Sequence, residues 1–212
     1  MHVIDLTHTI CENMPVYPGT EHPKLTVATT CEKDYFQETV LQMYSHTGTH
    51  MDAPAHVFTD RTTLDQFPAE RFAGMALVID CRHLKAGDRI TLDCLKPYGD
   101  KVRQAEYLLF NTGWDQYWGT EAYFGDFPCI DEAVLDLIMA GNYKGIGVDT
   151  ISIDPMAKLV RHRILLKDLD VLIVENLTNL QRCGKALFRF CCLPLKWEHA
   201  DGAPARAIAW FD

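Results

Sequence analysis

Short runs of the chain are either continuously apolar or alternate between apolar and polar residues, patterns typical of buried and half-buried β-strands. These runs cover residues 3–10, 24–30, 39–44, 75–80, 107–112, 145–149, 171–175, 186–193 and 207–211. Helical spacing is rarer: it predicts a short helix after Thr91, a helix over 130–140 and another over 158–167. Strands therefore dominate the predicted structure.

The predicted helix over 130–140 is amphipathic, since Val134 and Ile138 share one side, Asp136 faces another, and Gly141 provides a stop. We expect it to pack on a sheet. Loops rich in proline or glycine, at 14–23 and 96–100, do not resemble interdomain linkers. The 212 residues are enough for one core, so we expect a single domain over 1–212. The predicted class is α/β, with a mixed, largely β core and a few covering helices.

Charge narrows the range of partners. The 29 acidic residues outnumber the 20 Lys and Arg, and the formal charge of −9 disfavours nucleic acid and anionic membrane surfaces. Residues 1–10 lack the basic region and apolar run of a secretory signal, and no stretch is long and apolar enough to cross a bilayer. We therefore expect a cytoplasmic protein with a small-molecule substrate.

The eight cysteines lack the spacing of a redox or zinc motif. Most stand singly in hydrophobic stretches, and the adjacent Cys191 and Cys192 would point to opposite faces of a strand. We interpret them as reduced, mostly buried structural thiols.

Candidate chemistry is concentrated in one segment. Three of the nine histidines and one aspartate, His46, His50, Asp52 and His56, fall within eleven residues. Imidazole and carboxylate together suit borderline divalent ions such as zinc. Gly48, Pro54 and the small residues Ala53 and Ala55 predict that this segment is a loop wrapped around an ion. A solvated polar loop is the alternative, but a core would not bury so many polar groups without an ion or partners.

The segment from 46 to 56 reads His-Thr-Gly-Thr-His-Met-Asp-Ala-Pro-Ala-His. In this it resembles the cyclase-like metal-dependent hydrolases, a family that includes bacterial kynurenine formamidase and isatin hydrolase, whose signature is His-x-Gly-Thr-His-x-Asp-x-Pro-x-His. The resemblance extends along nearly the whole chain through shorter segments, at residues 5–8, 15–19, 111–114, 147–149, 175–177 and 201–206. It implies a swivelling β/β/α fold and a homo-oligomer, either a dimer or a tetramer.

The resemblance also implies a binuclear metal site. His46, His50 and Asp52 would bind one ion, and Asp52 would bridge to a second held by His162 and Glu175. Glu175 ends an apolar strand, where an unpaired carboxylate would be costly to bury. The interval from His162 to Glu175 is one residue longer than usual in the family. Two divalent ions are expected, with zinc as the first candidate and manganese as the second.

The expected reaction is hydrolysis of an amide. A divalent ion lowers the pKa of water toward about 7 and polarises a carbonyl. The departing nitrogen then needs a proton, which the resemblance assigns to His56; a further ligand or an orienting residue is the other interpretation of His56. Tyr17 and Trp114 are candidate substrate contacts, with packing as the alternative. Tyr17 stands where the kynurenine formamidase branch usually carries tryptophan.

The leading prediction is an arylformamidase that converts N-formylkynurenine-type amides to formate and the aryl amine, a step in tryptophan catabolism. Opening of a cyclic amide such as isatin is the close alternative within the same chemistry. A non-catalytic metal-binding protein is the alternative from another class. A nucleotide-dependent enzyme is disfavoured, because residues 145–147 are too short for a dinucleotide motif and no phosphate-binding loop with lysine occurs.

Overall fold

The computed structural model describes residues 1–168 and 171–211 of the chain. Within this part, seven strands close into a barrel, because β12 pairs with β11 on one side and with β4 on the other. The barrel strands, in spatial order, are β12 (Gly202–Phe211), β11 (Phe188–Pro194), β5 (Ala73–Asp80), β7 (Tyr107–Asn111), β9 (Gly145–Val148), β10 (Leu172–Glu175) and β4 (His50–Asp52). The pairs β5–β7, β7–β9 and β9–β10 are parallel and the others antiparallel.

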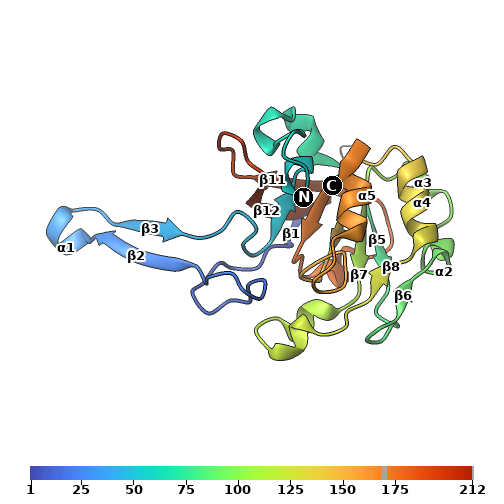
Figure 1. Ribbon diagram of the computed structural model, residues 1–212, viewed down its shortest axis with the longest axis horizontal. Helices are drawn as coiled ribbons and strands as arrows, with labels where there is room; N and C mark the ends of the chain where they lie inside the picture. Colours follow the sequence, from blue (N-terminus) through green and yellow to red (C-terminus); the bar gives the residue numbers. More distant parts are fainter. Residues whose placement is uncertain (169–170, 212) are drawn as a thin grey trace.

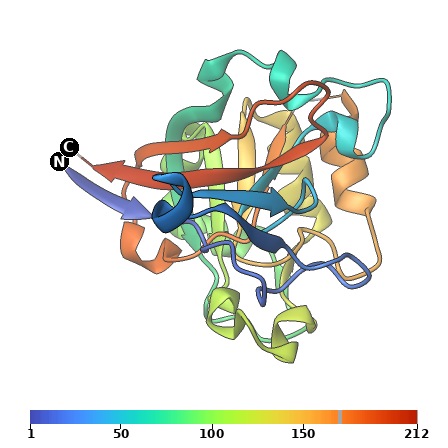
Figure 2. The same ribbon diagram turned by 90° about the vertical axis from the view of Figure 1, so that its left-hand side faces the viewer.

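Strand β1 (His2–Asp5) extends the sheet along the far half of β12, where His2 pairs with Phe211. Both ends of the described chain therefore lie side by side, as Figure 2 shows. Strands β6 (Arg89–Ile90) and β8 (Cys129–Ile130) form a separate short pair.

Helices α2 to α5 cover one side of the barrel (Figure 1). The α-helices are α1 (Cys31–Asp34), α2 (Leu92–Leu95), α3 (Lys101–Gln104), α4 (Glu132–Ala140) and α5 (Val160–Asp168). Short 3₁₀ turns occur at Pro54–His56, Leu64–Gln66, Ala69–Phe72, Lys96–Tyr98, Trp114–Tyr117, Glu121–Phe124 and Leu180–Cys183. The predicted mixed, largely β core with a few covering helices is confirmed.

Alternation along the strands builds two cores. In β5, Ala76 and Val78 point into the barrel, whereas Leu77 and Ile79 point outward and pack with residues of α4 and α5. The barrel interior is narrow: a Cβ added to Gly147 in β9 would lie 2.6 Å from Leu177 and 2.7 Å from Leu109. Glycine there lets β9 approach the packed interior.

A hairpin arm leaves this body. It consists of β2 (Lys24–Thr29), α1 at the tip and β3 (Glu38–Gln42), and it projects well beyond the barrel (Figure 1). Every residue of β3 is exposed, and the arm displays large apolar side chains to solvent: Val27, Tyr35, Phe36, Val40 and Leu41. We use "the arm" for residues 24–42 below.

Two sequence predictions of local structure were wrong. Residues 46–56 are not one loop, because His50–Asp52 form β4 between β10 and β12. The last strand, predicted over residues 207–211, is longer than expected, since β12 begins at Gly202. Among the cysteines, Cys192 is buried and Cys191 half-buried on opposite faces as expected, whereas Cys31 is exposed. The described residues include no helix with the length and apolar character needed for a membrane span.

Candidate metal centre

Two neighbouring strands carry three polar side chains to the outer face of the barrel. In β4, Met51 points into the core, so His50 and Asp52 point the other way. Glu175 is the cross-strand partner of His50 in β10. His50 Nε2 lies 3.2 Å from Asp52 Oδ1 and 3.5 Å from Glu175 Oε2. Antiparallel register thus gathers one imidazole and two carboxylates, all buried.

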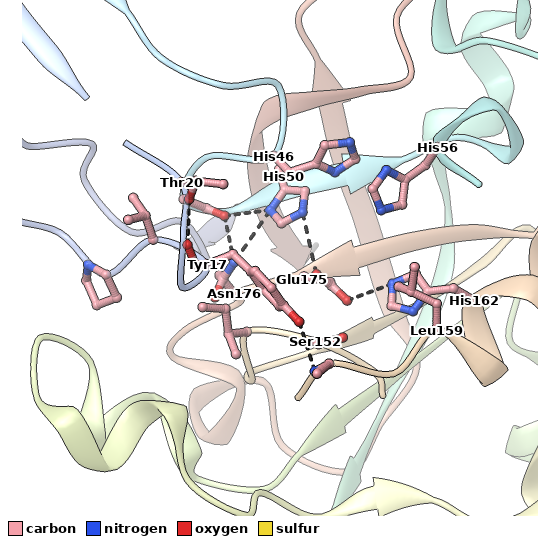
Figure 3. Close-up of a pocket in the computed structure, with 15 residues that line it drawn as sticks. Tyr17, Thr20, His46, His50, His56, Ser152, Leu159, His162, Glu175 and Asn176 are labelled. Carbon is pink, nitrogen blue, oxygen red and sulfur yellow. Dashed lines mark hydrogen bonds and ion pairs between the residues drawn. The ribbon is translucent and has the colours of Figure 1, made fainter. Parts of the chain in front are cut away.

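Helix α5 adds His162 to this group, as Figure 3 shows. His162 Nε2 lies 3.1 Å from Glu175 Oε1 and 3.4 Å from Asp52 Oδ2. The extra residue between His162 and Glu175 therefore does not prevent their side chains from meeting. Glu175 Oε1 also accepts a hydrogen bond from the backbone N–H of Ile153, at 3.0 Å.

His46 reaches the same group from the loop before β4. Its Nδ1 lies 2.7 Å from Asp52 Oδ1, and its ring lies directly over Gly202 of β12. A Cβ at position 202 would lie 2.3 Å from His46 Cε1, so only glycine leaves room for the ring. Gly202 is also the strand partner of Asp52, which places the ring beside that carboxylate.

Two compact groups of ligand atoms result, each with its atoms within 4.8 Å of one another: His46, His50 and Asp52, and Asp52, His162 and Glu175. Asp52 belongs to both. The structure thus brings together all five residues for which the sequence predicted metal binding. A third group of this kind contains His46, His56 and Asp201.

The charge balance of the group attracts cations. Burial disfavours protonation of His46, but the carboxylates of Asp52 and Asp201 outweigh it and raise its pKa to about 10. The pKa of His162 likewise rises well above its usual value, because the carboxylates of Asp154, Asp52 and Glu175 overcome the effect of burial. Asp52 Oδ2 is buried without a hydrogen-bond partner. A divalent ion would fit this set of donor atoms and would give Asp52 Oδ2 a partner.

His56 lies beside this group, in the 3₁₀ turn Pro54–His56. Its ring centroid is 3.9 Å from that of His46 and 6.0 Å from that of His162. Burial lowers the pKa of His56 below its usual value. The imidazole is therefore mainly neutral near pH 7 and is able to accept a proton.

A cavity of about 380 Å³ opens over these side chains. His46, His50, His56, His162 and Glu175 line one side, and Figure 3 shows them facing a wall from other loops. The apolar wall consists of Pro15, Val16, Tyr17, Ile151, Ala157 and Leu159. The Tyr17 hydroxyl accepts a hydrogen bond from the backbone N–H of Ala157, at 2.9 Å, which joins two loops of that wall.

Trp114, the other predicted substrate contact, is not among the cavity-lining residues. It is buried in a small cluster with Tyr123, Phe127 and Ile151, and its Nε1–H donates to the carbonyl of Tyr123 at 3.0 Å. This placement favours the packing role that the sequence left open.

Sequence reasoning missed three polar residues around the group. Asp154 contacts His162, Asp201 contacts His46, and Asn176 donates to the Gly48 carbonyl that also contacts His50. Asn176 has φ of 58°, a left-handed conformation that asparagine tolerates better than most residues. The only sequence signal for Asn176 and Asp201 was their place in the shorter family segments.

Comparison with known proteins gives a consistent result. Residues 4–155 match the sequence model of the family described as "Putative cyclase". A kynurenine formamidase of Bordetella avium is 28% identical over 96% of this chain and 95% of its own length.

Solved structures agree. Isatin hydrolase A from Ralstonia solanacearum superimposes with a TM-score of 0.86 at 26% identity, over 98% of this chain and 91% of that one. A structure described as a potential metal-dependent hydrolase with cyclase activity gives a TM-score of 0.76 at 28% identity, over 98% and 96%. The predicted fold class is confirmed.

Proposed function

This chain belongs to the cyclase family of hydrolases, and we propose that it is a metal-dependent amide hydrolase acting on N-formyl aryl amines of the N-formylkynurenine type. Water and the formamide would give formate and the free aryl amine. One observation carries the proposal: two ligand groups that share Asp52 lie at a cavity whose remaining lining is mostly apolar.

We assign His46, His50 and Asp52 to one divalent ion, and Asp52, His162 and Glu175 to a second. The donor set of imidazoles and carboxylates suits zinc first and manganese second. Asp52 Oδ2 is buried without a hydrogen bond and faces His162 Nε2 at 3.4 Å, which supports a bridging role for this carboxylate. Bound ions would supply a Lewis acid for the carbonyl and would lower the pKa of an attacking water toward about 7.

His56 is the proposed general base and acid. Its ring lines the cavity beside His46, and its lowered pKa keeps it neutral, so that it accepts a proton from the attacking water. The same nitrogen then returns the proton to the departing amine nitrogen, which leaves poorly as an anion. A non-catalytic metal-binding protein would have no need of this histidine at the cavity.

The apolar wall would hold the aryl part of the substrate. Tyr17, about 39% exposed, offers a ring face at this wall. Opening of a cyclic aryl amide such as isatin is the second candidate. It is favoured by the absence of any Lys or Arg among the described lining residues, because isatin carries no carboxylate that would need a cation.

The test compares chelator-treated protein with the same protein restored with zinc or manganese, with N-formylkynurenine and isatin as parallel substrates. We expect metal-dependent formation of kynurenine and about two ions per chain by elemental analysis. The variant Asp52→Asn removes one negative charge from both ligand groups and should abolish turnover. Turnover that survives full metal removal would refute the metal-dependent reaction; turnover of isatin alone would select the second candidate.

A further inference from the structure

All three histidines of the proposed ligand groups are held at one ring nitrogen by an acceptor outside the groups. His50 Nδ1 lies 2.8 Å from the Gly48 carbonyl oxygen, and His162 Nδ1 lies 2.9 Å from Asp154 Oδ2. His46 is turned the other way: its Nε2 lies 3.0 Å from Asp201 Oδ2. Carbonyl and carboxylate oxygens only accept, so once an ion takes the nitrogen that faces Asp52 or Glu175, the outer nitrogen of each ring carries its proton.

From this geometry we infer that Asp154 and Asp201 are positioning residues, and that His46 presents Nδ1 to its ion whereas His50 and His162 present Nε2. The inference rests on the proposed metal site and deepens it. The other nitrogen of each ring faces Asp52 or Glu175, the carboxylates of the proposed ligand groups, and is therefore the one that an ion would take. An outer acceptor that holds one nitrogen fixes both the tautomer and the direction of the other.

Asp154 is built for this purpose. Its side chain is fully buried, and Oδ2 accepts both the backbone N–H of His162, at 3.1 Å, and the ring Nδ1–H. Two contacts from one residue to one oxygen restrict rotation of the His162 side chain. Arg161 adds its backbone N–H and guanidinium, which keep the carboxylate ionised although it is buried.

Asp201 holds His46 from the exposed side. Its Oδ2 lies 3.0 Å from His46 Nε2 and accepts the Ser45 hydroxyl at 3.2 Å, while Gly202 leaves room beneath the ring. The Asp201 side chain is 44% exposed, so a substitution there does not open the core. Asp201 also belongs to the third ligand group with His46 and His56, so direct metal binding by Asp201 is the competing role.

The first experiment measures zinc affinity by competition with a chromophoric chelator and zinc content by elemental analysis. For Asp201→Ala we expect about 10–100-fold weaker binding with the number of ions at saturation unchanged. Asp201→Asn should recover most of the affinity, because its amide oxygen still accepts from Nε2–H. Ser45→Ala is the matched control: it removes the other partner of Asp201 and should stay within about twofold of the parent. Asp154→Asn should weaken binding as Asp201→Ala does, because both oxygens of Asp154 accept hydrogen bonds and an amide would turn its NH₂ group toward the donors of Arg161 or His162.

The second measurement reads the ring nitrogens directly. In the zinc-loaded protein, long-range ¹H–¹⁵N spectra should show the proton of His46 on Nε2 and those of His50 and His162 on Nδ1. A His46 proton on Nδ1, or unchanged affinity in both Asp201→Ala and Asp154→Asn, would overturn the inference. Loss of one ion from the saturated Asp201→Ala protein would show that Asp201 is a ligand. Failure of the parent protein to bind any zinc would instead refute the proposed function.

Discussion

Replacing Gly202 with alanine would test whether metal binding and turnover depend on the observed position of the His46 ring. The added Cβ would lie 2.3 Å from Cε1, 2.7 Å from Nε2 and 2.8 Å from Nδ1 of His46. Nonbonded carbon atoms normally stay about 3.5 Å apart, so the ring must retreat by about 1 Å. Metal–ligand bonds tolerate only about 0.2 Å. We therefore expect zinc affinity to fall about 10–100-fold and kcat/KM by about 100-fold or more.

Gly141→Ala provides the control. Its added Cβ would also lie 2.3 Å from a ring atom, Cε2 of Tyr143, but at the end of α4 and outside the cavity lining. Both variants should lose about 1–3 kcal/mol of unfolding free energy through overpacking, measured by urea denaturation without metal. Only Gly202→Ala should lose zinc affinity in the chelator competition. Parent-like affinity and turnover in Gly202→Ala would refute a ligand role for His46.

Four further outcomes are expected. His56→Ala should lower kcat by about 10²–10⁴-fold with zinc content unchanged, whereas a loss of zinc would make His56 a ligand. Burial raises the pKa of Asp149 to about 7, so the folded chain keeps a proton that the unfolded chain releases above about 4. The contribution of Asp149 to the free energy of unfolding should therefore fall as pH rises from about 4 to about 7. In urea titrations at pH 5 and pH 8, the change in the free energy of unfolding should be more negative for the parent than for Asp149→Asn; equal changes would contradict it. Replacing N-formylkynurenine with 2-formamidoacetophenone, which lacks the amino-acid group, should change kcat/KM by less than about tenfold, because no Lys or Arg lines the described cavity; a larger loss would reveal recognition of the carboxylate. Light scattering should give two or four times the chain mass of 24.1 kDa, as the predicted homo-oligomer requires, and a monomer mass would refute that prediction.

Local pattern was enough to predict most strands, because a short run that is apolar or alternating marks a strand whatever its partner. It was not enough for β4. His50, Met51 and Asp52 do alternate, but Gly48 and Pro54 on either side favoured a loop. The partners that make this segment a strand, β10 and β12, lie more than a hundred residues further along the chain.

The residues of the candidate site also divide into those that local sequence pattern predicted and those that it did not. The His-rich segment pointed to its own residues by their chemistry, whereas Glu175 and His162 came mainly from the family resemblance. Asp154 was missed, because an Asp-Pro pair in a loop is typical of a turn. It reaches His162 only because α5 folds back over that loop, and no local pattern encodes such a contact.

The arm gives the molecule a region whose local stability is separate from that of the barrel. The arm is a two-stranded ribbon in which every residue of β3 is exposed, so few buried contacts stabilise it. Its backbone amides should therefore exchange hydrogen for deuterium rapidly in the monomer. The backbone amides of β4 and β10 belong to the hydrogen-bonded barrel wall that carries the proposed ligands. They can exchange only when these strands separate locally. Slowed exchange in the arm would thus report that the surface of another molecule covers it, while slowed exchange in β4 and β10 would report bound ions. One labelling experiment could follow the two events separately along the same chain.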